Sequence, residues 1–426
     1  HTAYDLFSSG VDAFLFHNRS IQNRIDDSVV RIIDGKERFI RRSRGYAPEP
    51  VRLDAPADGI FAAGAELKNC FCLGKGNQAI MSQHIGDLKN AGVYDFYNRT
   101  VQDFLRLFRV EPRYVVCDMH PDYRSTRYAR NFITQYNRIG GGKRNGHARL
   151  MKVQHHHAHV VACMAENGLN EQVIGVALDG TGYGDDGKIW GGEFLVCDRK
   201  EYHRFSHLQY TAMPGGDKAV EEPWRMAVSY LYQAFGDGLY ELELDFITGK
   251  APEDIKLITS MIRKEINSPL TSSAGRLFDA VSAILNICTH AGYEAEPAML
   301  LESSVEEGVE GSYGFELTAE GISLIPAFRE LVSDLQEGQP RPVIAAKFHN
   351  TLARIIQSVS LKIREQKGLN HVVLSGGTFQ NKYLSEAAAR YLREDGFEVY
   401  QHLLVPANDG GIALGQLAIA SAIINS

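Results

Sequence analysis

Short hydrophobic runs alternate with longer amphipathic segments along most of this chain. Runs typical of buried strands stand at 60–63, 114–118, 173–178 and 371–374. In 343–366, by contrast, apolar residues recur every three to four positions, which predicts one long amphipathic helix. Strands that alternate with helices in this way predict an α/β fold.

Two parts of the chain share one local plan, in which a strand is followed by a turn and a returning strand. In the first part 60–63 is followed by 69–73, and in the second part 173–178 is followed by 193–197. This repetition predicts a pair of related lobes. We therefore divide the chain into an N-terminal part (1–57), a first lobe (58–170) and a second lobe (171–426).

Other elements are predicted from the same patterns. Expected strands are 14–16, 26–32, 151–153 and 397–404; expected helices are the segment from 154 to Gly168, 99–109, most of 223–300, 381–393 and 411–424. Asp34-Gly35 is a turn pair. The charged run 38–44 is either a solvated face or an anion-binding strip.

Composition narrows the class of protein. The chain has 426 residues, too many for one core, and a formal net charge of -7, which argues against a general nucleic-acid binder. Six cysteines without a CxxC pair predict reduced thiols, with Cys70 and Cys72 on one face of a strand. No apolar run reaches the roughly 18 residues that span a bilayer, and the opening HTAYDLFSSG is not a signal peptide. We expect a cytoplasmic protein whose partners are neither nucleic acid nor membrane.

A histidine run supplies the first candidate chemistry. His155 and His159 are four residues apart on a predicted helix, so both rings lie on one face and can converge on one ion. Imidazole suits zinc or iron, but two ligands do not close a site, and carboxylates must come from elsewhere. The alternative is a histidine-rich helix end without a metal.

Glycine-rich turns supply the next candidates. After one strand, Asp179 is followed by Gly180-Thr181-Gly182, and this turn leads into another strand. Bare glycine backbone lets amide groups approach phosphate oxygens closely, and the strand-end carboxylate can face an ion. The alternative is an ordinary β-hairpin.

The C-terminal third adds a second such turn. Ser375-Gly376-Gly377 follows a buried strand and places bare backbone against a flat ligand, and Asn381 is expected as a helix cap or a ribose contact. Asp409, before the final helix, is expected as a helix cap or as a further metal carboxylate.

The order of these motifs is more specific than any one of them. HHxAH, LDGTGYG, LSGGTFQN and NDGG follow one another, together with DDSVVR, RRSRGYAPEP, GAELKN, MPGGDKA, EPWRMA and GRLFDAV. This series resembles the HypF carbamoyltransferases of hydrogenase maturation. More broadly it is similar to the TsaD-type superfamily, which has a two-lobed actin-like ATPase fold. The resemblance covers nearly the whole chain.

The resemblance implies roles for particular residues. The metal ligands are His155, His159, Asp179 and Asp409, and the metal is iron or zinc. The nucleotide-binding residues are Gly180, Thr181, Gly182, Asp279, Gly376, Gly377 and Asn381, and magnesium accompanies the nucleotide. Lys68 contacts phosphates and, with His155, His159 and Asp179, belongs to the catalytic set. Ala295 stands where the family often has glycine, so no contact is assigned to its loop.

The resemblance also implies a reaction. Residues 1–57 would be the α+β tail of a YrdC-like domain, which makes carbamoyl adenylate from carbamoyl phosphate and ATP. The rest would transfer the carbamoyl group to the C-terminal cysteine of the partner HypE, as the precursor of a cyanide ligand of nickel–iron hydrogenase. Three alternatives stay open: a tRNA threonylcarbamoyl transferase, a small-molecule O-carbamoyltransferase similar to TobZ, and a non-enzymatic ATP-binding module.

Overall fold

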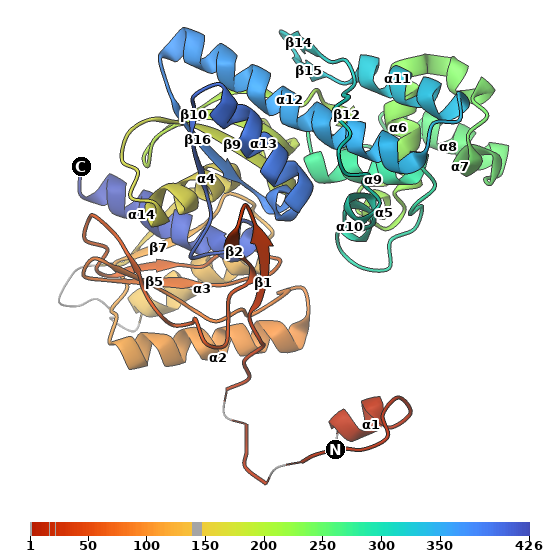
Figure 1. The fold of residues 1–426 in the computed structure, drawn as a ribbon. Helices are drawn as coiled ribbons and strands as arrows, with labels where there is room; N and C mark the ends of the chain where they lie inside the picture. The colour runs from red at the N-terminus through yellow and green to blue at the C-terminus, as the bar shows by residue number, and fades with distance from the viewer. Residues whose placement is uncertain (1, 17, 22, 139–146) are drawn as a thin grey trace.

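The computed structural model describes residues 2–16, 18–21, 23–138 and 147–426, so His1 lies outside the described part. Two α/β lobes carry most of these residues, and a small N-terminal part crosses from one to the other (Figure 1). The predicted α/β class is therefore confirmed.

The first sheet has the order β3-β6-β5-β4-β7-β8. Its strands are β3 (Val51–Arg52), β4 (Ile60–Ala62), β5 (Cys72–Lys75), β6 (Gln78–Met81), β7 (Tyr114–Asp118) and β8 (Arg149–Val153). β4 pairs antiparallel with a returning strand, as predicted, and parallel with β7. That returning strand, β5, begins at Cys72 and not at Asn69, so Cys70 lies outside it and does not share a strand face with Cys72. Helices α2 (Ala91–Phe108) and α3 (Arg124–Arg138) bury aromatic side chains against Phe61 and Phe71 of this lobe.

The second sheet has the order β12-β13-β10-β9-β16-β17, and β11 pairs with β10. Its strands are β9 (Val173–Tyr183), β10 (Ile189–Cys197), β11 (Tyr202–His207), β12 (Thr211–Ala212), β13 (Leu270–Thr271), β16 (His371–Ser375) and β17 (Glu398–Gln401). β9 pairs antiparallel with β10 and parallel with β16.

The two sheets repeat one topology. Strands β6-β5-β4-β7-β8 and β11-β10-β9-β16-β17 run in the same order, with an antiparallel meander followed by two parallel strands. The predicted relation between the lobes is visible in this correspondence. Because parallel strands of one sheet end at the same edge, residues at the ends of β9 and β16 are brought together in the second lobe.

Two helices lie between the sheets (Figure 1). α4 (His155–Glu166) packs on β9 and β16, and α14 (Ile412–Ile424) packs on α4, β4 and β7. They approach closely at Gly415, where a Cβ would overlap the carbonyl oxygen of Ala158. Both helices are buried, α14 on nearly every side, which explains its continuous apolar sequence.

The remaining helices belong to the second lobe, where several of them pack mainly on one another and lie to one side of the sheet (Figure 1). They are α5 (Lys218–Glu221), α6 (Trp224–Phe235), α7 (Asp245–Thr248), α8 (Pro252–Arg263), α9 (Ala274–Ile284), α10 (Glu296–Ser303), α11 (Ile325–Gln336), α12 (Arg341–Lys367) and α13 (Lys382–Glu394). A short hairpin, β14 (Glu316–Thr318) with β15 (Gly321–Ser323), and three 3-10 helices complete the lobe: η1 (Gly236–Glu241), η2 (Gly377–Gln380) and η3 (Asp409–Gly411). The long helix predicted at 343–366 is α12, so this prediction is confirmed.

The N-terminal part contains α1 (Thr2–Phe7) and the hairpin β1 (Val29–Ile33) with β2 (Lys36–Arg41). The predicted Asp34-Gly35 turn joins these strands, with φ of 52° and 67°. The strand predicted at 14–16 is wrong, because this segment pairs with no described strand and Leu15 is fully exposed.

Neither interpretation of the charged run 38–44 is correct for buried Arg42 or for half-buried Arg38. Arg42 is 6% exposed and donates to the carbonyl oxygens of Tyr46 and Glu49, at 2.9 and 2.6 Å. Arg38 donates to Gln401 and to the carbonyl of His402. Neutral oxygens, mostly of the backbone, thus accept from these guanidinium groups, which reduces the cost of burying their charge.

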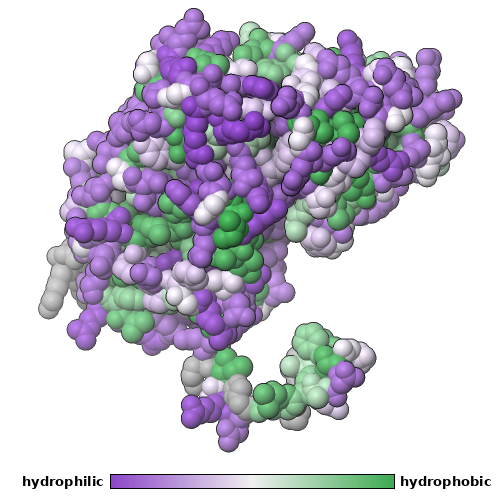
Figure 2. Space-filling view, in the orientation of Figure 1, coloured by the Kyte–Doolittle hydropathy of each residue, from purple (hydrophilic) through white to green (hydrophobic). Residues whose placement is uncertain are grey.

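Hydrophilic residues cover most of the face in Figure 2, with an apolar patch over the β1–β2 hairpin. Val29, Val30 and Ile32 of β1 are exposed there. Among the described helices, none is both long and apolar enough to cross a membrane. The six cysteines are buried free thiols, as predicted.

Candidate functional site

The candidate centre is built on the first turns of α4, between the two lobes. Gln154 caps this helix, since its side-chain oxygen accepts from the His157 amide at 2.9 Å. The cap starts the helix at His155, and the helical repeat then places His159 on the same face. Both imidazole rings are at most 1% exposed.

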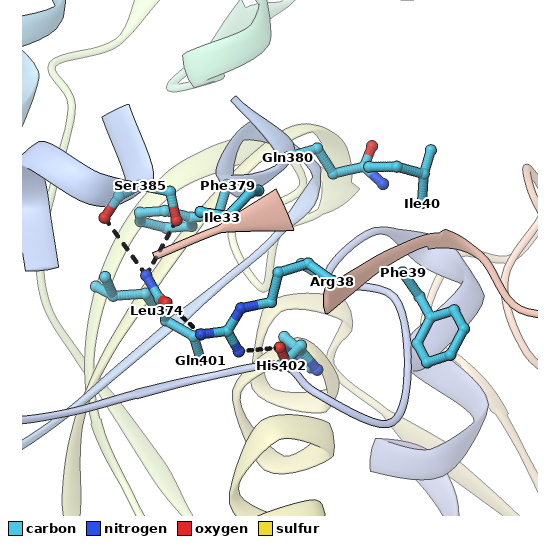
Figure 3. Close-up of a pocket in the computed structure, with 11 residues that line it drawn as sticks. Ile33, Arg38, Phe39, Ile40, Leu374, Phe379, Gln380, Ser385, Gln401 and His402 are labelled. Carbon is cyan, nitrogen blue, oxygen red and sulfur yellow. Dashed lines mark hydrogen bonds between the residues drawn. The ribbon is translucent and has the colours of Figure 1, made fainter. Parts of the chain in front are cut away.

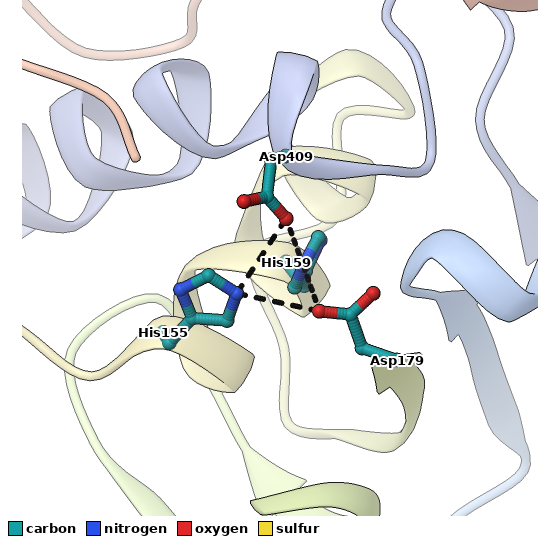
Figure 4. Close-up of side chains that lie close together, drawn as sticks. All are labelled: His155, His159, Asp179 and Asp409. Carbon is teal, nitrogen blue, oxygen red and sulfur yellow. Dashed lines mark ion pairs between the residues drawn. The ribbon is translucent and has the colours of Figure 1, made fainter. Parts of the chain in front are cut away.

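Two carboxylates from the second lobe face these rings (Figure 4). Asp179 lies on β9, and Asp409 lies in η3 just before α14. Asp179 Oδ2 is 3.4 Å from His155 Nε2 and 3.6 Å from His159 Nε2. Asp409 Oδ1 is 3.7 Å from each of these two nitrogens. The structure thus brings together all four residues that the resemblance assigns to the metal.

The four groups fit a metal ion. His155 Nε2 and His159 Nε2 are buried and have no hydrogen-bond partner among the described residues. Ligands held at about 2.0–2.2 Å around a tetrahedral ion lie roughly 3.3–3.6 Å apart, which is close to the separations observed here. Two imidazoles with two carboxylates suit iron or zinc.

The electrostatics of the centre are strongly coupled. Burial alone would raise the pKa of Asp179, but the imidazole rings of His155 and His159 facing it hold that pKa well below its usual range. Burial raises the pKa of Asp409 to about 6, against the opposing charge of His155. A divalent cation would be attracted by both carboxylates and would offset the cost of burying them.

Asp118 is a residue of this site that the sequence analysis missed. Its Oδ2 lies 2.8 Å from His155 Nδ1, and its side chain is fully buried at the end of β7. A carboxylate on Nδ1 fixes the orientation of the ring, so that Nε2 faces the other ligands. Its position at a strand end, like that of Asp179, is a signal that would have indicated it.

A cavity of about 430 Å³ adjoins the metal residues. Asp179, Gly180 and Thr181 line one part of it, and Gly377 and Asn381 line another. Apolar side chains of Phe278, Ala298, Met299, Val29 and Val30 also line the cavity, together with the charged Arg31, Arg276 and Glu302. This volume suits a nucleotide-sized ligand, with its charged end toward the metal residues and its flat end against the apolar side chains. The sequence analysis did not anticipate that the N-terminal hairpin forms part of this lining.

Gly377 contacts a metal residue and also lines the cavity, whereas Gly376, which was expected at the nucleotide, does not line it. Gly377 N donates to Asp179 Oδ1 at 3.0 Å. Asn381 caps α13, as expected, because its Oδ1 accepts from Leu384 N at 2.9 Å. Its amide nitrogen lies 2.9 Å from the ring of buried His349, which leaves one amide hydrogen for a ligand.

Lys68 reaches the mouth of the cavity from the first lobe. Its ammonium lies 2.6 Å from a carboxylate oxygen of Glu294, which stands on the second lobe. Ala295 follows with φ of 64°, a conformation that favours glycine. Glu294 and Ala295 both line the cavity. The sequence analysis had assigned no contact to the loop that contains Ala295.

Gly182, which was expected at the nucleotide, does not line the cavity, whereas Gly180 and Thr181 do. A Cβ on Gly182 would overlap Cε1 of His156 and lie 2.8 Å from Cδ2 of His155. We therefore expect Gly182→Ala to displace the His155 ring and to weaken metal binding about tenfold or more. Competition with a chromophoric chelator measures this affinity. Gly180→Ala is the matched control, since its Cβ would meet nothing within 4 Å, and equal losses in both variants would contradict the expectation.

Asp279, expected at the nucleotide, lines the cavity and pairs with Arg276 at 2.8 Å. Burial raises its pKa from 3.8 to about 6, although Arg276 opposes this. The folded protein thus holds the Asp279 proton to higher pH than the unfolded chain does. Its contribution to stability is complete below about pH 4 and is lost as pH rises toward 6.

This difference predicts a pH dependence. Between pH 4 and 6, the free energy of unfolding should fall in the wild type by on the order of 2–3 kcal/mol relative to Asp279→Asn. Urea unfolding of both proteins across this range measures the change. Parallel pH profiles of the two proteins would show that Asp279 ionises alike in the folded and unfolded states.

Known proteins share these features. Residues 175–416 match a family described as carbamoyltransferase, Kae1-like domain, second subdomain, and residues 55–166 match one described as HypF Kae1-like domain. Carbamoyltransferase HypF of Rhizobium leguminosarum bv. viciae is 38% identical over 97% of this chain and 52% of its own length. The carbamoyltransferase HypF homolog of Cupriavidus necator is 33% identical over 85% of this chain and 91% of its own length.

A solved structure agrees with these matches. A crystal structure of full-length HypF in the phosphate- and nucleotide-bound form is 40% identical, with a TM-score of 0.91 over 100% of this chain and 65% of that chain. The predicted resemblance and the two-lobed actin-like fold class are thereby confirmed. This chain spans about half the length of the Rhizobium protein.

Proposed function

Because this chain belongs to the HypF carbamoyltransferase family, we propose that it transfers a carbamoyl group from carbamoyl adenylate to the C-terminal cysteine thiolate of HypE. Carbamoyl adenylate would be made from carbamoyl phosphate and ATP, and the product would supply a cyanide ligand of nickel–iron hydrogenase. The observation that carries the proposal is one cavity lined both by the metal residues Asp179 and Asp409 and by the glycine turns at Gly180 and Gly377.

The cavity suggests how carbamoyl adenylate lies. The adenine ring packs between Phe278, Met299 and the hairpin strand β1, while the phosphate lies at Gly180 and Gly377. The carbamoyl group then points to the centre formed by α4 and Asp409. The related structure described as nucleotide-bound supports a nucleotide in this fold.

The protein residues contribute charge stabilisation and orientation. In the transfer, the acceptor sulfur forms a bond to the carbamoyl carbon, and the bond from this carbon to the phosphate oxygen breaks with its electron pair leaving on AMP. Backbone amides of the glycine turns stabilise the charge that develops on AMP. Lys68 exchanges Glu294 for the phosphate as the ligand enters. A metal held by His155, His159, Asp179 and Asp409 would supply Lewis acidity at this centre.

The test uses the full-length protein with carbamoyl phosphate, ATP and HypE. Mass spectrometry of HypE should then show a carbamoyl adduct on its C-terminal cysteine. Absence of that adduct, or preferential carbamoylation of a tRNA or an aminoglycoside added as a competing acceptor, would contradict the proposal.

A further inference from the structure

A buried chain of three polar side chains lies behind the metal centre. Ser375 Oγ is 2.8 Å from the carbonyl oxygen of His159 and 2.7 Å from His402 Nε2. His402 Nδ1 is in turn 2.6 Å from Glu166 Oε1. Ser375 is fully buried, and the His402 and Glu166 side chains are at most 4% exposed. None of these three residues has a role in the proposed transfer.

The directions of the hydrogen bonds follow from the atoms involved. A carbonyl oxygen can only accept, so the Ser375 hydroxyl donates to His159, and Ser375 accepts from His402 Nε2. His402 Nδ1 and Glu166 Oε1 lie 2.6 Å apart as an ion-pair contact, without the geometry of a hydrogen bond. The other oxygen of Glu166 accepts from the amides of Leu403, at 3.0 Å, and Leu404.

Two other interpretations do not fit these directions and distances. A Ser–His–Glu nucleophile would donate its hydroxyl proton to the histidine, whereas Ser375 donates to a carbonyl and does not line the nucleotide cavity. Cys163 lies close to Glu166 and His402, which raises the alternative of a second metal. Two ligands of a tetrahedral zinc ion lie roughly 3.3 Å apart, and the observed 2.6 Å between His402 and Glu166 is too short for that.

The segment Ser375-Gly376-Gly377 contacts three parts of the metal centre. These are α4, Asp179 on β9 and the loop just before Asp409. Ser375 binds the carbonyl of His159, and Gly377 N donates to Asp179 Oδ1 at 3.0 Å. Gly376 N donates to Ala407 O at 3.1 Å, two residues before Asp409. The relative positions of the metal residues therefore depend on where Ser375 is held.

The N-terminal hairpin supports the other side of His402. Figure 3 shows Arg38 of β2 extending to Gln401 and to the His402 carbonyl, while Gln401 in turn donates to Ser385. The adjoining space is about 20 Å³, enough for one water molecule. His402 is thus held from both sides and has little freedom to move.

We propose that Ser375, His402 and Glu166 are positioning residues of the metal centre. They hold the turn of α4 that carries His159 at a fixed position relative to the glycine turn Ser375-Gly376-Gly377. This inference rests on the metal centre of the proposed function. Loss of an outer support commonly weakens metal affinity by 10- to 100-fold. Because the three residues act in series, removing two of them should cost little more than removing one.

The experiment measures Co²⁺ affinity by chelator competition, the visible Co²⁺ spectrum and urea unfolding on the same protein samples. Ser375→Ala and His402→Gln should each weaken Co²⁺ binding about tenfold and alter the spectrum, and the double variant should match the single ones. Ser375→Thr, which keeps the hydroxyl, should restore affinity. Ser360→Ala removes another fully buried hydroxyl, in α12, and should leave Co²⁺ binding unchanged.

The outcomes separate this inference from the proposed function. If His159→Ala abolishes Co²⁺ binding while the Ser375 and His402 variants bind as the wild type does, the positioning role is refuted and the metal centre stands. If His159→Ala binds as the wild type does, the metal centre itself is wrong. Two bound ions in the wild type, one of them lost only in His402→Gln, would identify a second metal site instead. If Ser375→Ala does not fold, Ser375→Cys is measured in its place. A Co²⁺ affinity and a Co²⁺ spectrum equal to those of the wild type in Ser375→Cys would refute the positioning role.

Discussion

His159→Ala is expected to empty the metal centre and to lower carbamoyl transfer by more than about 100-fold. The substitution removes one of the four proposed ligands and leaves Asp179 and Asp409 facing only the His155 ring. Loss of a direct ligand should exceed the 10- to 100-fold effect typical of outer-shell partners. Elemental analysis gives the metal content, and the HypE adduct gives the transfer rate.

His157→Gln is the matched control for this prediction. His157 belongs to the same histidine run, but its Nε2 lies 2.7 Å from the carbonyl of Asp198, away from the centre. Glutamine keeps a donor for that carbonyl, so metal content should stay at the wild-type level. If neither variant lost metal, the run would be a histidine-rich helix end without a metal, which is the alternative that the sequence left open.

Gly376→Ala is expected to destabilise the protein by about 3 kcal/mol or more and to abolish nucleotide binding. Gly376 has φ of 101°, and a Cβ there would overlap the carbonyl oxygen of Leu178 and lie 2.7 Å from its carbon. The left-handed region costs a non-glycine residue roughly 1–2 kcal/mol. The overlap adds to this, because β9 and β16 are paired and cannot separate without loss of the ladder.

Gly396→Ala separates these two costs. Gly396 has φ of 80°, but a Cβ there would meet nothing within 4 Å. This variant should lose only about 1 kcal/mol and bind nucleotide normally. Urea unfolding and calorimetric titration with AMP measure both quantities. Equal destabilisation of the two variants would show that the close approach at Leu178 has no energetic effect.

The local elements of the fold were predictable because their signals lie within a few residues of one another. The amphipathic period identified α12, and the turn pair Asp34-Gly35 identified the first hairpin. The segment 14–16 shows the limit of this reasoning, since its residues suit a strand but no described partner pairs with it. A strand requires a neighbour that local sequence does not specify.

The division of the chain at 57/58 and 170/171 stays a prediction. Strand β3, before the first boundary, pairs in the first sheet, and α14, at the end of the chain, packs on β4 and β7. Long-range packing of this kind has no local signal, because helices between two sheets are apolar on every side and do not indicate which sheet they contact.

The histidine pair at the opening of α4 was determined by sequence alone, because an i,i+4 spacing on a helix has one geometrical outcome. The assignment of Asp179 and Asp409 came from the resemblance, and the tertiary structure brought them to His155. Asp118 lies 37 residues from His155, and Ser375 lies 216 residues from His159, so only the fold decided those contacts. The sequence therefore determined which residues can bind a metal, and the packing of both sheets against α4 decided which residues hold them in place.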